Sequence, residues 1–421
     1  MFRIVAGSGP ARTLARAQLV GSVGDGAFYA CSVLFFTRVI GLSPTRVGFA
    51  LTLGWAVGML AGVPLGRLAD RWGPRRTAVA LAGATAGTLA AFLVVRSFPL
   101  FAVTFAAYAC GQAGLTAARQ ALLAGLVPAG ERTGVRAGVQ SASNAGLAVG
   151  AGLGALALCF GTRPAYLAVF GMDAVGFGAA ALILARLPEA PVVPRVNGPR
   201  PAVLRDRPYA LVTFLNAVMY LNMPLLSLGL PLGVVRRTGA PAPVAAALLV
   251  VNMLSVVVFQ VRVARPVSGP AAAARATRRA GTLLAAACAV YALSGARAGV
   301  VVTVAVLVVA ALLQVFGEML QGAGGWELSF ALAPEGGHGQ YQGFYGMAPQ
   351  FARMVGPLVL TTLLLGWGGA GWLVLGGVFL AAGLAMGPVT RYATRTRTAP
   401  RAGAGAGRPV ETPVCAGDRC S

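Results

Sequence analysis

Long apolar segments make up most of the chain, and short stretches rich in Arg, Pro and Gly separate them. A transmembrane helix needs about 20 mostly apolar residues to cross a hydrocarbon core of about 30 Å. Twelve segments approach this length, at residues 15–39, 46–66, 76–95, 99–125, 138–160, 164–186, 209–234, 243–263, 279–295, 299–331, 342–366 and 370–389. The pattern therefore predicts an all-α membrane protein with twelve transmembrane helices.

The composition excludes a soluble globular domain and does not favour nucleic-acid binding. Of the 421 residues, 57% are hydrophobic and 11% are charged, whereas soluble domains have about 25% charged residues. The formal charge is +23, and all 34 basic residues are Arg. Because these arginines lie between apolar segments and do not cluster with aromatics on one face, we expect a lipid bilayer around the protein and no nucleic-acid partner.

The distribution of arginine predicts the orientation of the chain in the membrane. With the N-terminus inside, 25 Arg fall in inner segments and seven in outer loops. Cytoplasmic loops carry an excess of Lys and Arg. We therefore expect both termini to be cytoplasmic.

The chain divides into two halves of six predicted helices each, residues 1–187 and 209–390. Residues 188–208 between them are rich in Pro and Arg, as in a cytoplasmic linker. Residues 391–421 are polar and of low complexity, so we expect a disordered cytoplasmic tail.

The stretch between the second and third predicted helices reads GRLADRWGPRR. An acid among four arginines at the membrane face can form charge-assisted hydrogen bonds and can approach the positive N-terminal end of a neighbouring helix. An ordinary basic loop would explain the arginines but not the acid beside well-spaced glycines. The residues that define the pattern are Gly66, Leu68, Ala69, Asp70, Arg71, Gly73, Arg75 and Arg76.

This stretch resembles the motif that major facilitator superfamily transporters carry between helices two and three. The resemblance implies a latch of the outward-facing state, in which Asp70 lies near the eleventh helix with Arg71 and Arg119 as partners. At the corresponding site of the second half, Arg265 is retained but Ala264 replaces the acid, so the latch is expected to be one-sided.

Residues 118–138 and 332–346 resemble loops of bacterial drug-exporter members of the same superfamily, which implies a location in the bacterial plasma membrane. In the fifth segment, Gly146, Gly150 and Gly154 resemble the antiporter pattern of these exporters, although Ala151 stands in place of its Pro. Small residues at this spacing also allow helices to pack closely, so helix packing is an equal alternative.

Four acids fall inside predicted membrane segments, where an unpaired charge costs on the order of 3 kcal/mol. Asp25 shares one helical face with Ser22, Tyr29 and Ser32, which indicates a cavity wall. The resemblance implies that such an acid takes up protons and cationic substrates. A structural contact between helices is the alternative.

The second half carries the other candidates. Glu318 and Gln321 share a face of the tenth segment, and Arg353 is a candidate partner of Glu318 or of an anionic substrate group. Asn222 belongs to a polar group in the seventh segment. The two remaining acids are Glu327, expected at a gate or interface, and Asp173, for which a structural role is favoured.

These features favour proton-coupled secondary export of a small amphipathic compound by a monomeric transporter without a cofactor. No G-x-x-x-x-G-K-[ST] loop is present, so ATP is not expected to drive it directly. The alternatives are a proton-coupled uptake symporter and, from another class, a membrane enzyme or receptor. His338, the single histidine, has no metal-ligand neighbour in the sequence and is expected to be a solvated loop residue.

Overall fold

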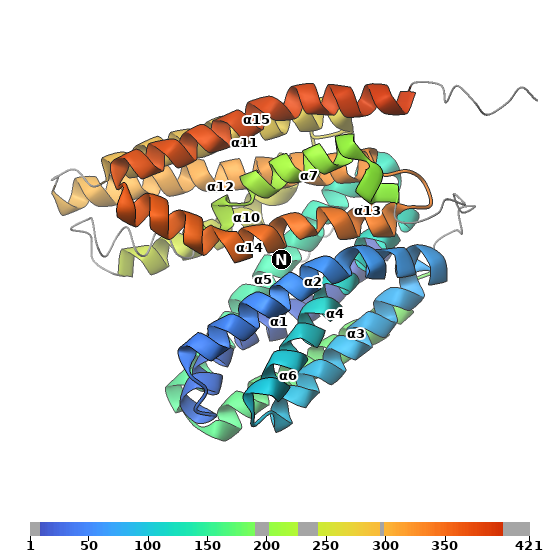
Figure 1. Cartoon of the computed structure of the whole chain (residues 1–421), viewed down its shortest axis with the longest axis vertical. Helices are drawn as coiled ribbons and strands as arrows, with labels where there is room; N and C mark the ends of the chain where they lie inside the picture. The colour runs from blue at the N-terminus through green and yellow to red at the C-terminus, as the bar shows by residue number, and fades with distance from the viewer. Residues whose placement is uncertain (1–8, 190–201, 226–242, 295–298, 399–421) are drawn as a thin grey trace, which may run out of the picture.

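The structure, a computed structural model, describes residues 9–189, 202–225, 243–294 and 299–398. Within these ranges every regular element is a helix, which confirms the predicted all-α fold. The helices form two bundles that are joined at one end and diverge towards the other (Figure 1).

The N-terminal bundle contains six long helices, each followed by a short connection. They are α1 (Gly9–Leu34, continued by a π-helical turn, Phe35–Val39), α2 (Pro44–Trp72), α3 (Pro74–Ala91), α4 (Phe98–Leu126), α5 (Arg132–Phe160) and α6 (Arg163–Ala185). Helix α1 packs on α5 and α6, while α3 packs on α4 and α6.

The C-terminal bundle repeats this plan with more interruptions. Its helices are α7 (Arg207–Met219), α8 (Asn222–Pro224), α10 (Pro243–Ala264), α11 (Gly269–Leu293), α12 (Val300–Ala331), α13 (His338–Tyr345), α14 (Met347–Leu360, continued by a π-helical turn, Thr361–Gly366) and α15 (Gly369–Thr398). Helix α11 packs between α12 and α15.

Nine of the described helices are long and apolar enough to cross a membrane. The seventh, ninth and eleventh predicted segments are not among these nine, each for a local reason. Three arginines near its start lower the mean hydropathy of α11, and a turn at Gly346 divides the eleventh segment into α13 and α14. The predicted seventh segment is described only as far as residue 225.

Several helix ends extend beyond the apolar segments that predict them. Helix α2 runs to Trp72, so most of the GRLADRWGPRR stretch is helical and not a loop. Only Gly73 separates α2 from α3, and its positive φ of 94° is a conformation that favours glycine. Helix α15 continues to Thr398, which corrects the predicted start of the disordered tail; residues 399–421 lie outside the described part.

The glycines of the fifth segment face α1. A side chain at Gly150 would collide with the carbonyl oxygen of Val23, and Gly146 and Gly154 are comparably close to α1. A side chain at Gly152, on another face, would meet no atom within 4 Å. The spacing of Gly146, Gly150 and Gly154 therefore serves close packing of α1 on α5.

The two bundles meet through α2 and α4 against α13, and through α5 against α10 and α12. The end of the molecule at which α2 joins α3 is called the motif end, because it carries the GRLADRWGPRR stretch (Figure 1). Large apolar side chains such as Val301, Phe160 and Leu358 are exposed on the outer faces of the bundles, as expected for helices surrounded by lipid.

Candidate functional site

A cavity of 340 Å³ lies between the two bundles. Its wall is amphipathic, with aromatic and thioether side chains next to many amides. The charged residues on the wall are Asp25, Arg119, Arg136, Glu318 and Arg353. Tyr29 and Gln321 also line the cavity, so five of the six predicted cavity residues do so; Asn222 is the exception.

Asp25 projects from the middle of α1 and is 9% exposed. Its Oδ1 accepts hydrogen bonds from the Tyr108 hydroxyl at 2.7 Å and from the Gln112 amide at 2.8 Å. The Tyr29 hydroxyl lies 3.3 Å from the Tyr108 hydroxyl, within hydrogen-bond distance. Among the described residues nothing hydrogen-bonds to Oδ2, so one oxygen is left for a proton, a water or a ligand.

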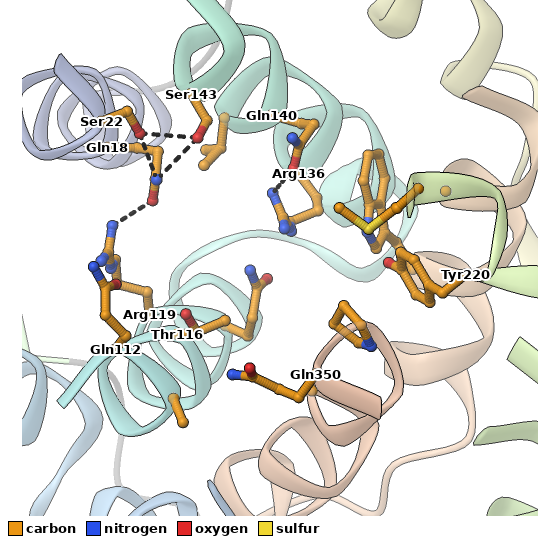
Figure 2. A pocket seen from close by; sticks show the side chains of 18 of the residues that line it. Gln18, Ser22, Gln112, Thr116, Arg119, Arg136, Gln140, Ser143, Tyr220 and Gln350 are labelled. Atoms are coloured by element: carbon orange, nitrogen blue, oxygen red, sulfur yellow. Dashed lines mark hydrogen bonds between the residues drawn. The ribbon is translucent and has the colours of Figure 1, made fainter. Parts of the chain in front are cut away.

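A second polar network joins α1, α4 and α5 (Figure 2). The Gln18 amide nitrogen donates to Ser22 at 3.0 Å and to Ser143 at 3.2 Å, while its oxygen accepts from the Arg119 Nη1. Arg119 therefore belongs to the cavity wall, near Asp25, and is not the partner of Asp70 that the family resemblance implies.

Arg136 reaches the cavity from α5. Its Nη1 donates to Gln140 at 3.3 Å, and its guanidinium lies over the Trp326 ring at 4.8 Å from the centroid. Arg119 and Arg136 both line the cavity. Sequence reasoning missed this pair as cavity residues.

A periodic signal could have found them. Tyr108, Gln112, Thr116 and Arg119 recur at intervals of three or four residues in α4, and Arg136 begins a similar stripe with Gln140 in α5. Such spacing marks one face of a helix.

The two charged cavity residues of the C-terminal bundle, Glu318 and Arg353, do not pair with each other. Glu318 accepts a hydrogen bond from Asn252 at 3.2 Å. The Arg353 guanidinium lies 5.4 Å from the centroid of the Trp55 ring, in the opposite bundle. The expected ion pair between Glu318 and Arg353 is absent from the ion pairs of the described residues.

Two polar residues of the seventh segment are used inside the C-terminal bundle. Asn222 is fully buried, and its amide donates to the Met219 carbonyl oxygen at 2.6 Å. Asn222 is not part of the described cavity wall, so its assignment to the substrate path stays a prediction. Asn216 accepts from Gln321 at 2.8 Å and so orients a cavity residue.

Asp173 is fully buried between α6 and α1, and among the residues with described positions neither of its carboxylate oxygens has a hydrogen-bond partner. It lies against Gly24, where a side chain would collide with it. An ionised carboxylate without partners is costly in such surroundings. The pocket therefore accommodates the neutral acid, one residue away from Asp25 along α1.

At the motif end, Asp70 joins the two bundles. Its Oδ1 accepts the backbone N–H of Gly339 at 2.6 Å, and its Oδ2 accepts that of Gln340 at 2.9 Å. These are free N–H groups of the first turn of α13, where a carboxylate also interacts favourably with the helix dipole. Asp70 thus caps a helix of the opposite bundle.

Glycines let α2 and α13 approach closely beside this cap. A side chain at Gly66 would collide with the Gly339 carbonyl oxygen, and one at Gly62 would lie 3.0 Å from that of Gly343. The four-residue spacing is the same on both helices. The glycine of the motif is therefore required by contact between the bundles.

The arginines of the motif act within the N-terminal bundle. Arg75 donates to the Ala185 carbonyl oxygen at 2.5 Å, and Arg76 donates to Glu189 at 3.1 Å. They hold the start of α3 against the end of α6. Arg71 lies exposed in the last turn of α2.

A second acid joins the bundles at the same end. Glu327, at the end of α12, accepts hydrogen bonds from the Thr133 hydroxyl of α5 and from the Gly269 N–H at 2.7 Å. The Thr133 contact crosses between the bundles, whereas the Gly269 contact lies within the C-terminal bundle. The C-terminal bundle therefore also has an acid at this contact, on α12 and not at Ala264.

His338, the first residue of α13, also belongs to this contact region and is not a solvated loop residue. Burial, together with the nearby charge of Arg132, lowers the pKa of His338 to about 4. The imidazole is therefore neutral at pH 7.

Comparison with known proteins agrees with this geometry. The sequence profile of the Major Facilitator Superfamily matches residues 17–357. No curated protein matches the chain in sequence.

Solved structures with a similar fold are all distant in sequence. The human organic anion transporter MFSD10 is 17% identical, with a TM-score of 0.69 over 91% of this chain and 99% of that one. A bacterial homologue of the iron transporter ferroportin in the outward-facing state is 18% identical, with a TM-score of 0.71 over 92% and 99%. The proton:xylose symporter XylE is 14% identical, with a TM-score of 0.70 over 90% and 94%. At these identities the likeness shows the fold alone.

The profile covers most of the chain, the two bundles have the fold of these transporters, and a polar cavity lies between them. The chain therefore belongs to the major facilitator superfamily and is a multi-pass secondary transporter that works by alternating access, not an enzyme.

Proposed function

We propose that this protein exports small amphipathic compounds in exchange for protons, with Asp25 as the proton-carrying side chain. The observation that carries the proposal is the setting of this carboxylate. Oδ1 is held by Tyr108 and Gln112, Oδ2 is without a hydrogen-bond partner among the described residues, and Asp25 lines the cavity. A fixed acid of this kind can exchange its proton for an interaction with a ligand or a water.

The cavity wall supports an amphipathic substrate. Trp55, Tyr220 and Trp326 offer apolar faces, and the amides of Gln112 and Gln350 lie among them. Ligand sites of this type combine apolar walls with a few polar groups that fix the orientation of the ligand.

The excess of arginine at the motif end supports a cytoplasmic location for that end. Because Asp70 contacts α13 and Glu327 contacts Thr133 across the bundles at that end, we take the described conformation to be the outward-facing state. Alternating access then requires both contacts to break when the cavity opens to the cytoplasm.

Uptake by proton symport is the second candidate. It is favoured by Ala151, which stands where the antiporter pattern has Pro, and by the use of Gly146, Gly150 and Gly154 in packing. The same fold and the same acid would serve both directions.

Transport into proteoliposomes with an imposed pH gradient tests the proposal. Three radiolabelled probes share one ring system and differ in charge: 2-naphthalenesulfonate, neutral 2-naphthalenesulfonamide and 2-naphthyltrimethylammonium. We expect movement of a probe against the proton flow, whereas movement with the proton flow would establish the symporter.

Asp25→Asn should remove the effect of the gradient, while Glu335→Gln, an exposed acid outside the cavity, should not. A wild-type response of Asp25→Asn would return Asp25 to a structural role. Insensitivity of every probe to the gradient in the wild type would rule out proton coupling.

A further inference from the structure

The charges of the five charged side chains on the cavity wall do not cancel. Three are arginines and two are acids. The ion pairs of the described residues all lie at the motif end, so no carboxylate is within 4 Å of a cavity arginine. The acids are occupied by neutral partners, Tyr108 and Gln112 for Asp25, and Asn252 for Glu318.

Arg119 is held in place but incompletely satisfied. One of its five N–H donors reaches the Gln18 oxygen, and Gln18 is itself fixed by Ser22 and Ser143. The Nε of Arg119 is buried and has no hydrogen-bond partner in the part of the chain that the structure describes. A buried donor without a partner is unfavourable, so this guanidinium is prepared for an acceptor that the protein does not provide.

Arg136 is fixed in a complementary way. Its plane lies over the Trp326 ring, and one N–H reaches Gln140. The aromatic contact and a single hydrogen bond orient the guanidinium, and its other donors have no hydrogen-bond partner within the described ranges. Arg119 and Arg136 reach the cavity from α4 and α5, with Tyr220 and Gln350 on the other side (Figure 2).

Arg119 and Arg136 line the same cavity, and positive groups there repel each other unless an anion lies between them. We infer that the transported compound carries an anionic group, a carboxylate or sulfonate, which is bound by Arg119 and Arg136 while its apolar ring packs against Trp326. Planar guanidinium groups bind such oxyanions through paired N–H donors. This inference extends the proposed function, on which it rests, to the chemical class of the substrate.

The anion also gives the aromatic residues a role. Trp326 of the C-terminal bundle lies against the Arg136 guanidinium, and Trp55 of the N-terminal bundle lies against the Arg353 guanidinium. A flat ring between these indoles would contact both bundles. The ligand is therefore an amphipathic organic anion and not a lipophilic cation, which the acids alone would favour.

Binding of the same three naphthalene probes to the purified full-length protein tests the inference, by isothermal titration calorimetry in detergent at one fixed pH. We expect the sulfonate to bind at least tenfold more tightly than the sulfonamide or the trimethylammonium compound. Arg119→Gln and Arg136→Gln should each weaken sulfonate binding at least tenfold.

Arg46→Gln, an exposed arginine over Phe98, is the matched control and should bind the sulfonate as the wild type does. Arg136→Lys keeps the charge but loses the planar donor pair, so its affinity should fall between those of the wild type and Arg136→Gln. Thermal unfolding of each variant would show whether it is folded. Arg136→Lys keeps the charge, so it tests the donor pair even if Arg136→Gln does not fold.

Undetectable binding of the sulfonate, equal or tighter binding of the cation, or wild-type sulfonate affinity in both glutamine variants would overturn the anion site. Because binding is measured without a gradient, it does not depend on proton coupling. Anion binding with pH-independent transport would refute the proposed coupling and leave the anion site intact.

Discussion

Replacing Asp70 by Asn should separate the two bundles at the motif end. The Asp70 carboxylate receives two backbone N–H groups of α13, at 2.6 and 2.9 Å, across the contact between the bundles. Asn has one acceptor oxygen and no charge. It therefore loses one hydrogen bond, the charge assistance of the other and the favourable interaction with the helix dipole.

The size of the effect follows from these contacts. A hydrogen bond to a charged group contributes about 1.5–3 kcal/mol, and a neutral one contributes about 1 kcal/mol. Asp70 is half-buried, so solvent screening reduces the difference. We expect a shift of about 2 kcal/mol, which is a factor of about 30 in the equilibrium between joined and separated bundles.

Amide hydrogen exchange measures this equilibrium without any added label. Residues 342–345 lie beyond the first turn of α13 and do not bond to Asp70, and Gly343 among them lies against Gly62 of α2. Their exchange should accelerate about 30-fold in Asp70→Asn, and so should that of residues 62–66 in α2. Exchange of this kind reports the free energy of local opening.

Glu189→Gln is the matched control. It removes an exposed acid at the same end that pairs with Arg75 and Arg76 inside the N-terminal bundle. It should leave exchange in α13 unchanged. If acceleration in Asp70→Asn were confined to Gly339 and Gln340, Asp70 would cap α13 without holding the bundles together, and the reasoning would be refuted.

Three further predictions concern packing, the second acid and pH. Gly150→Ala should lower the free energy of unfolding by about 1–3 kcal/mol, and Gly152→Ala should not, because only Gly150 faces α1. Equal thermal unfolding temperatures of the two variants would contradict this packing. Glu327→Gln should accelerate amide exchange in the first turn of α11 about tenfold, since the Gly269 N–H loses a charged acceptor; unchanged exchange would contradict the capping of α11 by Glu327. His338 has a pKa of about 4, below the usual value of about 6.5. The contribution of the neutral imidazole to the free energy of unfolding is therefore fully present above pH 6.5 and is lost as pH falls towards 4. The slope is at most about 1.4 kcal/mol per pH unit. Thermal unfolding against pH should lose this slope in His338→Gln, and an unchanged slope would assign it to another group.

The lengths of the apolar segments were sufficient to predict the helices. In lipid, each spanning segment must satisfy its own backbone hydrogen bonds, so an apolar run of the right length forms a helix almost regardless of its neighbours. The ends are less certain, because polar residues beyond the membrane can continue a helix. For this reason α2 and α15 extend past their apolar segments.

The candidate site was predicted only in part. An acid in an apolar segment is visible in the sequence, and helical spacing shows which neighbours share its face, as for Asp25 with Tyr29 and Glu318 with Gln321. The same reasoning could not place Asn222, because a polar side chain facing the bundle interior and one facing a cavity have the same spacing.

The sequence by itself determined the helical membrane fold, the family motif and the positions of the intramembrane charges. Only the tertiary structure decided which charges meet. Arg119 contacts Gln18 and not Asp70, and Arg353 does not pair with Glu318. Glu327 contacts Thr133 of the opposite bundle, whereas the motif position in the second half is occupied by Ala264. Electrostatic and hydrogen-bond energies depend on distances between side chains of different helices, and the periodicity of a single helix contains no information about those distances.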